Sequence, residues 1–235
     1  MMRTVNPKAP VLRLSVWALL AAIALVPLLL ATAMALFPGG HSGVAEGYSF
    51  SRHVVSDLGR TRLSDGTPNP VSSALFTAAM LLTGCATSLF WTARRLFVRQ
   101  PLARRVALGC GLVMSAGLAA VGLTPLNRAA AIHDPITAVT AIGGAAAVLA
   151  LFADADTRLE SQRGKRFWLV FLGVVAAVWT VLVGLHHERL IVFRPWLPLW
   201  QKTLIASFIA WMAYQTFCLL RFCRDAGKET GYETH

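Results

Sequence analysis

Six long apolar stretches dominate this sequence and constrain its fold more than any other feature. They run over residues 14–37, 70–93, 105–124, 135–153, 167–185 and 198–220. Each has about 19–24 residues, enough for one α-helix to cross a hydrocarbon core of about 30 Å. The composition agrees, because 56% of the residues are hydrophobic and only 14% are charged, whereas soluble domains carry about 25% charged residues. The sequence therefore predicts an all-α polytopic membrane protein, a bundle of six transmembrane helices.

The predicted organisation is one membrane domain with two short cytoplasmic ends. Residues 1–13 form the N-terminal segment, residues 14–220 the membrane domain and residues 221–235 the C-terminal tail. The first apolar stretch follows basic residues, as a signal peptide would, but it exceeds the roughly 7–15 apolar residues of such a peptide. We therefore expect it to be retained as the first helix. Residues 38–69 form a polar loop longer than the roughly 12–15 residues usual for a structureless connection, so we expect it to be partly ordered against the helix ends.

Positive charge is distributed unevenly between the predicted loops. When the six helices alternate in direction, 15 of the 22 Lys and Arg residues fall on one side of the membrane and 7 on the other. Because cytoplasmic loops are enriched in Lys and Arg, we expect both termini to be cytoplasmic, in the cell membrane, with the 38–69 loop outside. Lys and Arg residues beside the membrane, which are attracted to anionic lipid headgroups, account for much of the net charge of +11. We therefore expect membrane lipids as partners, and no nucleic acid.

Prolines and small residues punctuate the predicted helices. Asn69-Pro70 and Asp134-Pro135 each place a capping residue before a proline, which predicts that helices begin there. Pro125 is expected to close the third helix and Pro198 to open the last one. The third and fourth helices are rich in glycine and alanine, whose small side chains let helices approach each other, so we expect these two helices to pack closely. The same faces could join copies of the chain as a homo-oligomer.

Ionisable side chains lie at the ends of the apolar stretches, mostly outside. The middles of the six stretches contain no Asp, Glu, Lys, Arg or His. Such residues mark ion and proton pathways in membranes, so their absence argues against a pump or channel. Five of the six histidines fall on the outer side: His41, His53, His133, His186 and His187. No spacing of His and Cys typical of a zinc site or a disulfide framework is present, so we expect no metal and no cofactor.

Three segments carry a resemblance to a bacterial membrane family. They are HVVSDLGRTRLSDGTPNPVSSALF, GLAAVGLTPLNRAAAIHDPITAVTAIGG and WQKTLIASFIAWM. With its SDLG element, the chain resembles the family catalogued as domain of unknown function 998. The arrangement is also similar to the FRAG, damage-regulated autophagy modulator and Sfk membrane families, in which a Ser-Asp/Glu-x-Gly element pairs with a histidine before a later helix. The resemblance implies six helices and a role that touches lipids, and it supplies no reaction. Lys202 departs from the arginine common there, and His186-His187 has no counterpart.

The residues that match the polar elements of this family form the candidate site. They are Ser56, Asp57, Gly59, Asn69, His133, Gln201 and Lys202. We expect Asp57 and His133 to meet at the outer end of the bundle, where the carboxylate would fix the imidazole tautomer and the pair could bind a headgroup or move protons. The structural alternative is that Ser56 and Asp57 cap a turn while His133 ties the loop to the bundle.

Two classes of function stay open at this point. The first is a non-enzymatic protein that binds or organises lipid headgroups through the candidate site. The second is a lipid-modifying enzyme, a hydrolase or a transferase, with Asp57 and His133 as its acid–base pair and Ser49, Ser51 or Ser56 as nucleophile. A transporter is a distant third. The sequence favours binding, because neither an activated nucleophile nor a metal site is evident.

Overall fold

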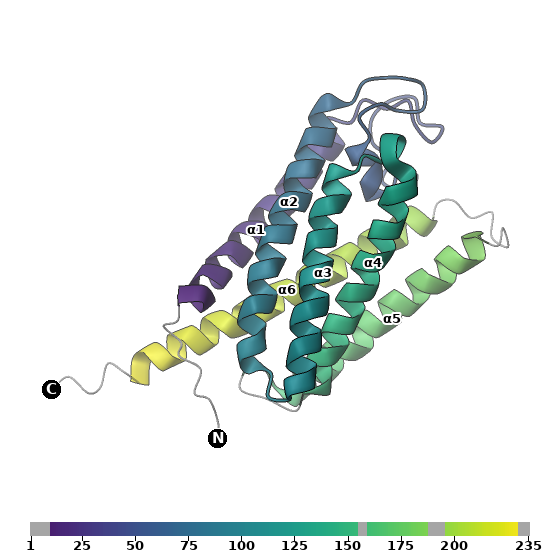
Figure 1. Cartoon of the computed structure of the whole chain (residues 1–235). Helices are drawn as coiled ribbons and strands as arrows, with labels where there is room; N and C mark the ends of the chain where they lie inside the picture. Colours follow the sequence, from purple (N-terminus) through teal and green to yellow (C-terminus); the bar gives the residue numbers. More distant parts are fainter. Residues whose placement is uncertain (1–9, 155–158, 188–195, 230–235) are drawn as a thin grey trace.

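The computed structural model describes residues 10–154, 159–187 and 196–229 as a bundle of long α-helices (Figure 1). In chain order these are α1 (Pro10–Ala35), α2 (Pro70–Arg94), α3 (Pro101–Leu123), α4 (Leu126–Ala153), α5 (Gln162–His187) and α6 (Trp196–Glu229), with short 3-10 helices η1 (Val55–Gly59) and η2 (Arg95–Phe97). No β-strand occurs within these ranges. The prediction of an all-α protein is confirmed.

Most of the helices have the length and composition of membrane spans. Five segments qualify: Leu14–Ala35, Pro70–Phe97, Pro101–Leu123, Leu126–Ala153 and Trp196–Asp225. Large apolar side chains on them point outward, such as Leu28, which is 61% exposed, and Ile142, which is 69% exposed. The chain is therefore a multi-pass membrane protein. A sixth crossing would be made by α5, where several side chains near the C-terminal end lie outside the described residues, so that crossing stays a prediction.

The first four helices pack in chain order, α1 on α2, α2 on α3 and α3 on α4, while α6 lies against α1 and α5 (Figure 1). Glycines allow the close approach. A Cβ atom added at Gly117 in α3 would lie 1.9 Å from Oγ1 of Thr140 in α4, and one at Gly84 in α2 would lie 2.7 Å from the carbonyl oxygen of Ser115 in α3. The expected close packing of the third and fourth helices is confirmed, and its cause is the small residues at their interface.

The start of α4 differs from the prediction. The helix begins at Leu126, so Asp134 and Pro135 lie inside it and do not open it. The carbonyl oxygen of Pro125 accepts the N–H of Ala129 at 2.9 Å, which completes a first helical turn without a capping side chain. A break in the backbone at Ala129 (φ −138°, ψ 35°) separates this turn from the long remainder of α4.

The other prolines stand close to their expected places. Pro70 is the first residue of α2, as predicted. Pro125 follows the end of α3 at Leu123, also as predicted. Pro198 lies in the first turn of α6, which begins two residues earlier, at Trp196.

Apolar side chains gather in two clusters. The larger one fills the bundle around Phe90, Trp91 and Trp211. The smaller one lies where α1 ends and α2 begins, and includes Phe37, Val55, Leu58, Leu63 and Phe76. Four of its members come from residues 36–69, the α1–α2 loop, which folds over one end of the bundle (Figure 1). This loop is therefore a packed cap with its own apolar base.

A buried ion pair holds the bundle where α2 ends. Nη2 of Arg94 donates to Oε1 of Glu160 at 3.1 Å, and Nε2 of Gln215 donates to Oε2 of the same carboxylate at 3.0 Å. These contacts join α2, α6 and the segment before α5. No sequence pattern predicts these contacts, since the three residues are distant from one another in the chain.

Candidate functional site

The SDLG element forms η1, a single turn that fits tightly against α2. Asp57 closes this turn, because its Oδ2 accepts the N–H of Val54 at 3.0 Å. Leu58 is fully buried in the apolar base of the loop. A Cβ atom added at Gly59 would lie 2.6 Å from the ring of Phe76. Glycine is therefore required here by the close contact between η1 and α2, and the turn places the Asp57 carboxylate inside the α1–α2 loop.

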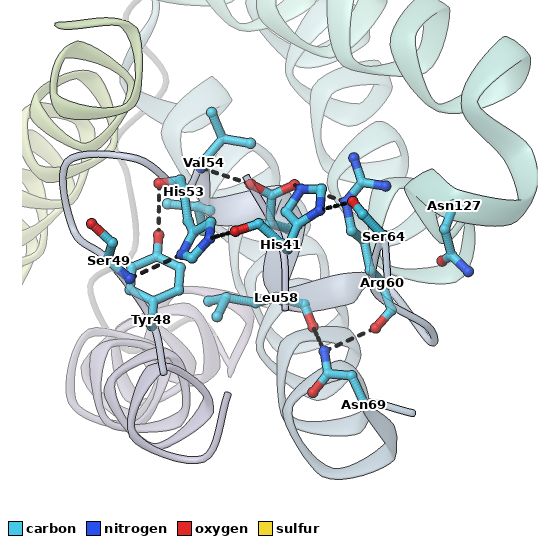
Figure 2. Close-up of polar contacts among 12 residues, drawn as sticks. His41, Tyr48, Ser49, His53, Val54, Leu58, Arg60, Ser64, Asn69 and Asn127 are labelled. Carbon is cyan, nitrogen blue, oxygen red and sulfur yellow. Dashed lines mark hydrogen bonds and ion pairs between the residues drawn. The ribbon is translucent and has the colours of Figure 1, made fainter. Parts of the chain in front are cut away.

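Two side chains of the loop contact the Asp57 carboxylate. Nε2 of His41 lies 3.1 Å from Oδ1, and Nε of Arg60 donates to the same oxygen at 2.8 Å. The side chain of Asp57 is 5% exposed, that of His41 10% and that of Arg60 20%. The other ring nitrogen of His41, Nδ1, contacts Oγ of Ser64. Figure 2 shows His41, Arg60 and Ser64 grouped on one side of the loop.

The partners of His41 define its tautomer. A carboxylate only accepts hydrogen bonds, so Nε2 carries the proton that is donated to Asp57. Nδ1 of the neutral ring is then an acceptor, and the Ser64 hydroxyl donates to it. Burial lowers the pKa of His41 below its ordinary value of 6.5, and this effect outweighs the neighbouring Asp57, which raises the pKa. His41 is therefore a neutral base at pH 7.

His53 is fully buried and holds the backbone around His41. Its Nδ1 accepts the N–H of Ser49 at 2.9 Å, and its Nε2 donates to the carbonyl oxygen of His41 at 2.9 Å (Figure 2). The hydroxyl of Tyr48 donates to the carbonyl oxygen of His53 at 3.0 Å. Burial raises the pKa of Tyr48 well above its ordinary value, so this hydroxyl stays protonated. His53 therefore has a structural position, with both ring nitrogens occupied.

Helix α6 fastens the loop through two of the predicted residues. Oε1 of Gln201 accepts the N–H of Val55 at 2.7 Å. The buried ammonium group of Lys202 donates to the carbonyl oxygens of His53 and Pro198 and lies 4.7 Å from the ring centre of Phe50. These contacts place Gln201 and Lys202 at the base of the loop, where they bind its backbone.

The remaining predicted residues have separate surroundings. His133 is buried, and its Nδ1 donates to the carbonyl oxygen of Thr124 at 2.7 Å. Ser56 is half-buried in η1. Within the described residues, the imidazole that contacts Asp57 belongs to His41, and a joint role for Asp57 and His133 stays a prediction.

Two asparagines complete the attachment of the loop. Asn69 stands at the predicted N-cap position of α2, but its side chain makes no capping bond. Its Nδ2 instead donates to the carbonyl oxygens of Leu58 and Arg60, at 3.2 and 2.9 Å. Asn127, in the first turn of α4, accepts the N–H of Thr61 at 3.0 Å. The loop is thus bonded to α2, α4 and α6, which fixes the cluster of Asp57 with its partners.

Sequence reasoning missed three members of this cluster, His41, Arg60 and Ser64. Arg60 could have been found, because it lies three residues after Asp57, a spacing at which side chains meet on a helical turn. The bond from Arg60 to Asp57 is made by Nε, and the side chain is 20% exposed, so Asp57 leaves the two terminal nitrogens of Arg60 unoccupied. The guanidinium is therefore held by its Nε and can still donate to an anionic ligand. No group of three His, Cys, Asp or Glu residues in the described part of the chain could hold a metal ion.

Comparison with known proteins identifies a family. The family model described as "Protein of unknown function (DUF998)" matches residues 29–217. The chain belongs to this family, since the match covers most of its length. No curated protein and no solved structure matches it. The similarity to the FRAG, damage-regulated autophagy modulator and Sfk families stays a resemblance.

Proposed function

We propose that this member of the DUF998 family binds phospholipid headgroups at the outer surface of the cell membrane, through the cluster of Asp57, His41 and Arg60 in the α1–α2 loop. The observation that carries the proposal is the guanidinium of Arg60, which Asp57 anchors through Nε while the side chain stays 20% exposed, so that Asp57 does not occupy its two terminal nitrogens. In this proposal His41 is the imidazole partner of Asp57, and the joint role of Asp57 and His133 that the sequence suggested stays a separate prediction.

The position of the loop supports a lipid ligand. Helix α2 has 25 residues, which corresponds to about 37 Å at 1.5 Å per residue. A hydrocarbon core is about 30 Å thick, so one end of α2 extends into the headgroup layer. The α1–α2 loop joins α2 at Pro70, and Phe50 on the loop is 57% exposed. An exposed apolar side chain on the loop that also carries the polar cluster suits the boundary between headgroups and acyl chains.

The chemistry of Arg60 supports an anionic group as the part that is bound. A planar guanidinium offers paired N–H donors that match the oxygens of a phosphate. The ion pair with Asp57 orients the guanidinium in advance, which reduces the entropy lost on binding. Gln201 and Lys202 support the site from α6 by holding the loop backbone. In this proposal Ser56 and His133 shape the same end of the bundle.

A thermal-shift titration tests headgroup binding. The full-length protein in dodecyl maltoside is titrated with dihexanoyl phosphatidylglycerol, and we expect its melting temperature to rise, because a ligand that binds only the folded state stabilises it. Loss of a charge-assisted hydrogen bond costs about 1.5–3 kcal/mol, so Arg60→Gln should weaken binding by roughly 10- to 150-fold.

Matched controls separate a specific site from general effects of charge. Arg52 is an exposed arginine of the same loop that donates to the carbonyl oxygen of Gly43, and Arg52→Gln should keep the shift. Dihexanoylglycerol, which lacks a phosphate, should give none. Equal shifts in the two arginine variants would contradict the proposal.

The proposed orientation, with both termini cytoplasmic, is tested by labelling. Arg62 is exposed on the loop, and Arg62→Cys is introduced into a chain from which the native cysteines have been removed. An impermeant maleimide should label this cysteine in intact cells. Labelling only after lysis would invert the proposed topology.

A further inference from the structure

The contacts of His41 connect a serine hydroxyl to a buried carboxylate. Oγ of Ser64 contacts Nδ1 of His41 (Figure 2). Nε2 of the same ring donates to Oδ1 of Asp57 at 3.1 Å. Residues 41, 57 and 64 come from three different turns of the α1–α2 loop. A nucleophile bonded to a base that is in turn oriented by a third group is the arrangement required for nucleophilic catalysis. Here the two ring nitrogens are used in the opposite sense to the serine protease triad, in which Nε2 faces the serine.

We propose that Ser64, His41 and Asp57 form a hydrolytic site that cleaves a carboxylic ester of the bound lipid, with Ser64 as nucleophile, His41 as general base and Asp57 as the residue that positions His41. The choice of a lipid ester as substrate rests on the proposed headgroup binding. The catalytic roles rest on the geometry of the three side chains alone.

Exposure differs among the three residues as this chemistry requires. Ser64 is exposed, so a substrate can reach its hydroxyl. The side chains of His41 and Asp57 are 10% and 5% exposed, so the base and its carboxylate partner are shielded from water. A neutral His41 with an acceptor at Nδ1 is in the protonation state that removes a proton from a hydroxyl.

The backbone holds Ser64 against His41 through two joined turns. The N–H of Gly66 donates to the carbonyl oxygen of Leu63 at 3.0 Å, which closes the turn that carries Ser64. The N–H of Asp65 donates to the carbonyl oxygen of Gly40 at 3.3 Å, which joins this turn to the one that carries His41. These bonds hold the backbones of the two turns side by side, which brings the side chains of Ser64 and His41 within reach of each other.

Arg60 indicates which ester is within reach. Its Nε and Nε2 of His41 bond to the same Asp57 oxygen, so a phosphate bound by Arg60 would lie beside the His41 ring. In a glycerophospholipid the acyl esters are separated from the phosphate by only a few bonds. Esters of this kind lie at the boundary between headgroups and hydrocarbon, where the loop joins the helices.

The reaction proceeds in two balanced steps and consumes one water. In the first, Oγ of Ser64 attacks the ester carbonyl carbon and its proton passes to Nδ1 of His41. The bond to the alcohol oxygen then breaks, and that oxygen leaves with the proton from Nδ1, which gives an acyl-serine and a lysolipid. In the second, water attacks the acyl carbon while Nδ1 takes its proton. The fatty acid is released, and Oγ of Ser64 regains the proton.

A fluorophosphonate probe tests the nucleophile. Such probes phosphonylate an activated serine and release fluoride, and they need no lipid site. We expect the full-length protein in dodecyl maltoside to be labelled at Ser64, as located by peptide mass spectrometry. Ser64→Ala should reduce labelling to the level of heat-denatured protein. Ser42→Ala is the matched control, since Ser42 is an exposed serine of the same loop and has no bond to His41 or Asp57 among the described residues, and it should be labelled like the unmodified protein.

The positioning role of Asp57 is tested through the pH profile of labelling. If Asp57 orients His41, Asp57→Asn should lower the labelling rate and change its dependence on pH, whereas a purely structural loss would lower it equally at every pH. Asp57→Glu should restore part of the rate. Equal loss at every pH would overturn this role of Asp57.

The labelling and lipid experiments distinguish a missing catalytic site from missing headgroup binding. The catalytic site is overturned if Ser64 stays unlabelled in protein that still melts cooperatively. It is also overturned if labelling persists in Ser64→Ala. Both conclusions hold even if phosphatidylglycerol raises the melting temperature. Labelling of Ser64 without such a shift supports the catalytic site and overturns headgroup binding. Release of octanoate from dioctanoyl phosphatidylglycerol, lost in Ser64→Ala, supports the lipid ester as substrate, and a labelled protein that releases none overturns that assignment.

Discussion

Replacement of Gly40 by alanine should open the α1–α2 loop, by an amount that the structure allows us to estimate. Gly40 has a φ of +78°, and a Cβ atom there would lie 2.1 Å from Oδ2 of Asp65. A non-glycine residue held in such a backbone conformation costs about 1–3 kcal/mol. To relieve the clash, Asp65 must move and give up the bond in which its Oδ1 accepts the N–H of Thr67 at 2.9 Å, a further loss of about 0.5–1.5 kcal/mol.

Gly47→Ala is the matched control, because it separates backbone strain from the clash. Gly47 has a φ of +68°, but no atom lies within 4 Å of the added Cβ position. Hydrogen exchange of peptides from residues 36–69 reports the free energy of local opening. Gly40→Ala should lower this free energy by about 1 kcal/mol more than Gly47→Ala does, which is roughly a fivefold difference in exchange rate. Equal exchange in the two variants would refute the contact between Gly40 and Asp65 on which the joined turns depend.

Three further predictions concern the bundle and the site. Gly117→Leu should destabilise the protein in detergent by about 1–3 kcal/mol, whereas Gly109→Leu, which meets no atom within 4 Å of its Cβ, should change the melting temperature little. Because the pKa of His41 is lowered in the folded state, the neutral ring stabilises the loop above pH 6.5 and this stability is lost as the pH falls below it. Protection factors of the loop amides, which correct for the pH dependence of free amide exchange, should therefore fall from pH 7.5 to pH 5.5, and should fall less in His41→Gln. In double-mutant cycles of melting stability, Asp57→Asn should couple more strongly to His41→Gln than to His133→Ala, and the reverse order would restore the pairing suggested by the sequence.

The helices could be predicted from the sequence because each depends on local information. An apolar stretch of about 20 residues has few alternatives in a membrane, and a proline such as Pro70 marks a helix start through its own geometry. The start of α4 could not be predicted in this way. Both Pro125 and Pro135 are acceptable first residues, and only the compact turn between α3 and α4 selects Leu126 as the beginning.

That shift explains the position of His133. With α4 beginning at Leu126, His133 lies seven residues inside the helix, which is about 10 Å along its axis. Its ring then reaches back to the carbonyl oxygen of Thr124. A histidine expected at the mouth of the bundle thus stabilises the connection between α3 and α4.

The partners of Asp57 depended on the tertiary structure of the loop. His41 and Ser64 lie 16 residues before and seven residues after it, and they are brought together by turns at positive-φ glycines such as Gly40 and Gly66. No periodicity links such residues, so the sequence indicated that the loop was ordered without indicating which side chains meet. Asp57 itself was found because its SDLG element resembles a known family.

Native mass spectrometry of the purified protein tests the central claim, that the Arg60 and Asp57 cluster binds a phospholipid, most directly. The full-length protein is released from dodecyl maltoside after incubation with phosphatidylglycerol, and the mass of retained lipid is measured for the unmodified chain, Arg60→Gln and Arg52→Gln. We predict one tightly retained phosphatidylglycerol in the unmodified chain and in Arg52→Gln, and its loss in Arg60→Gln. Equal retention in all three proteins would contradict the account.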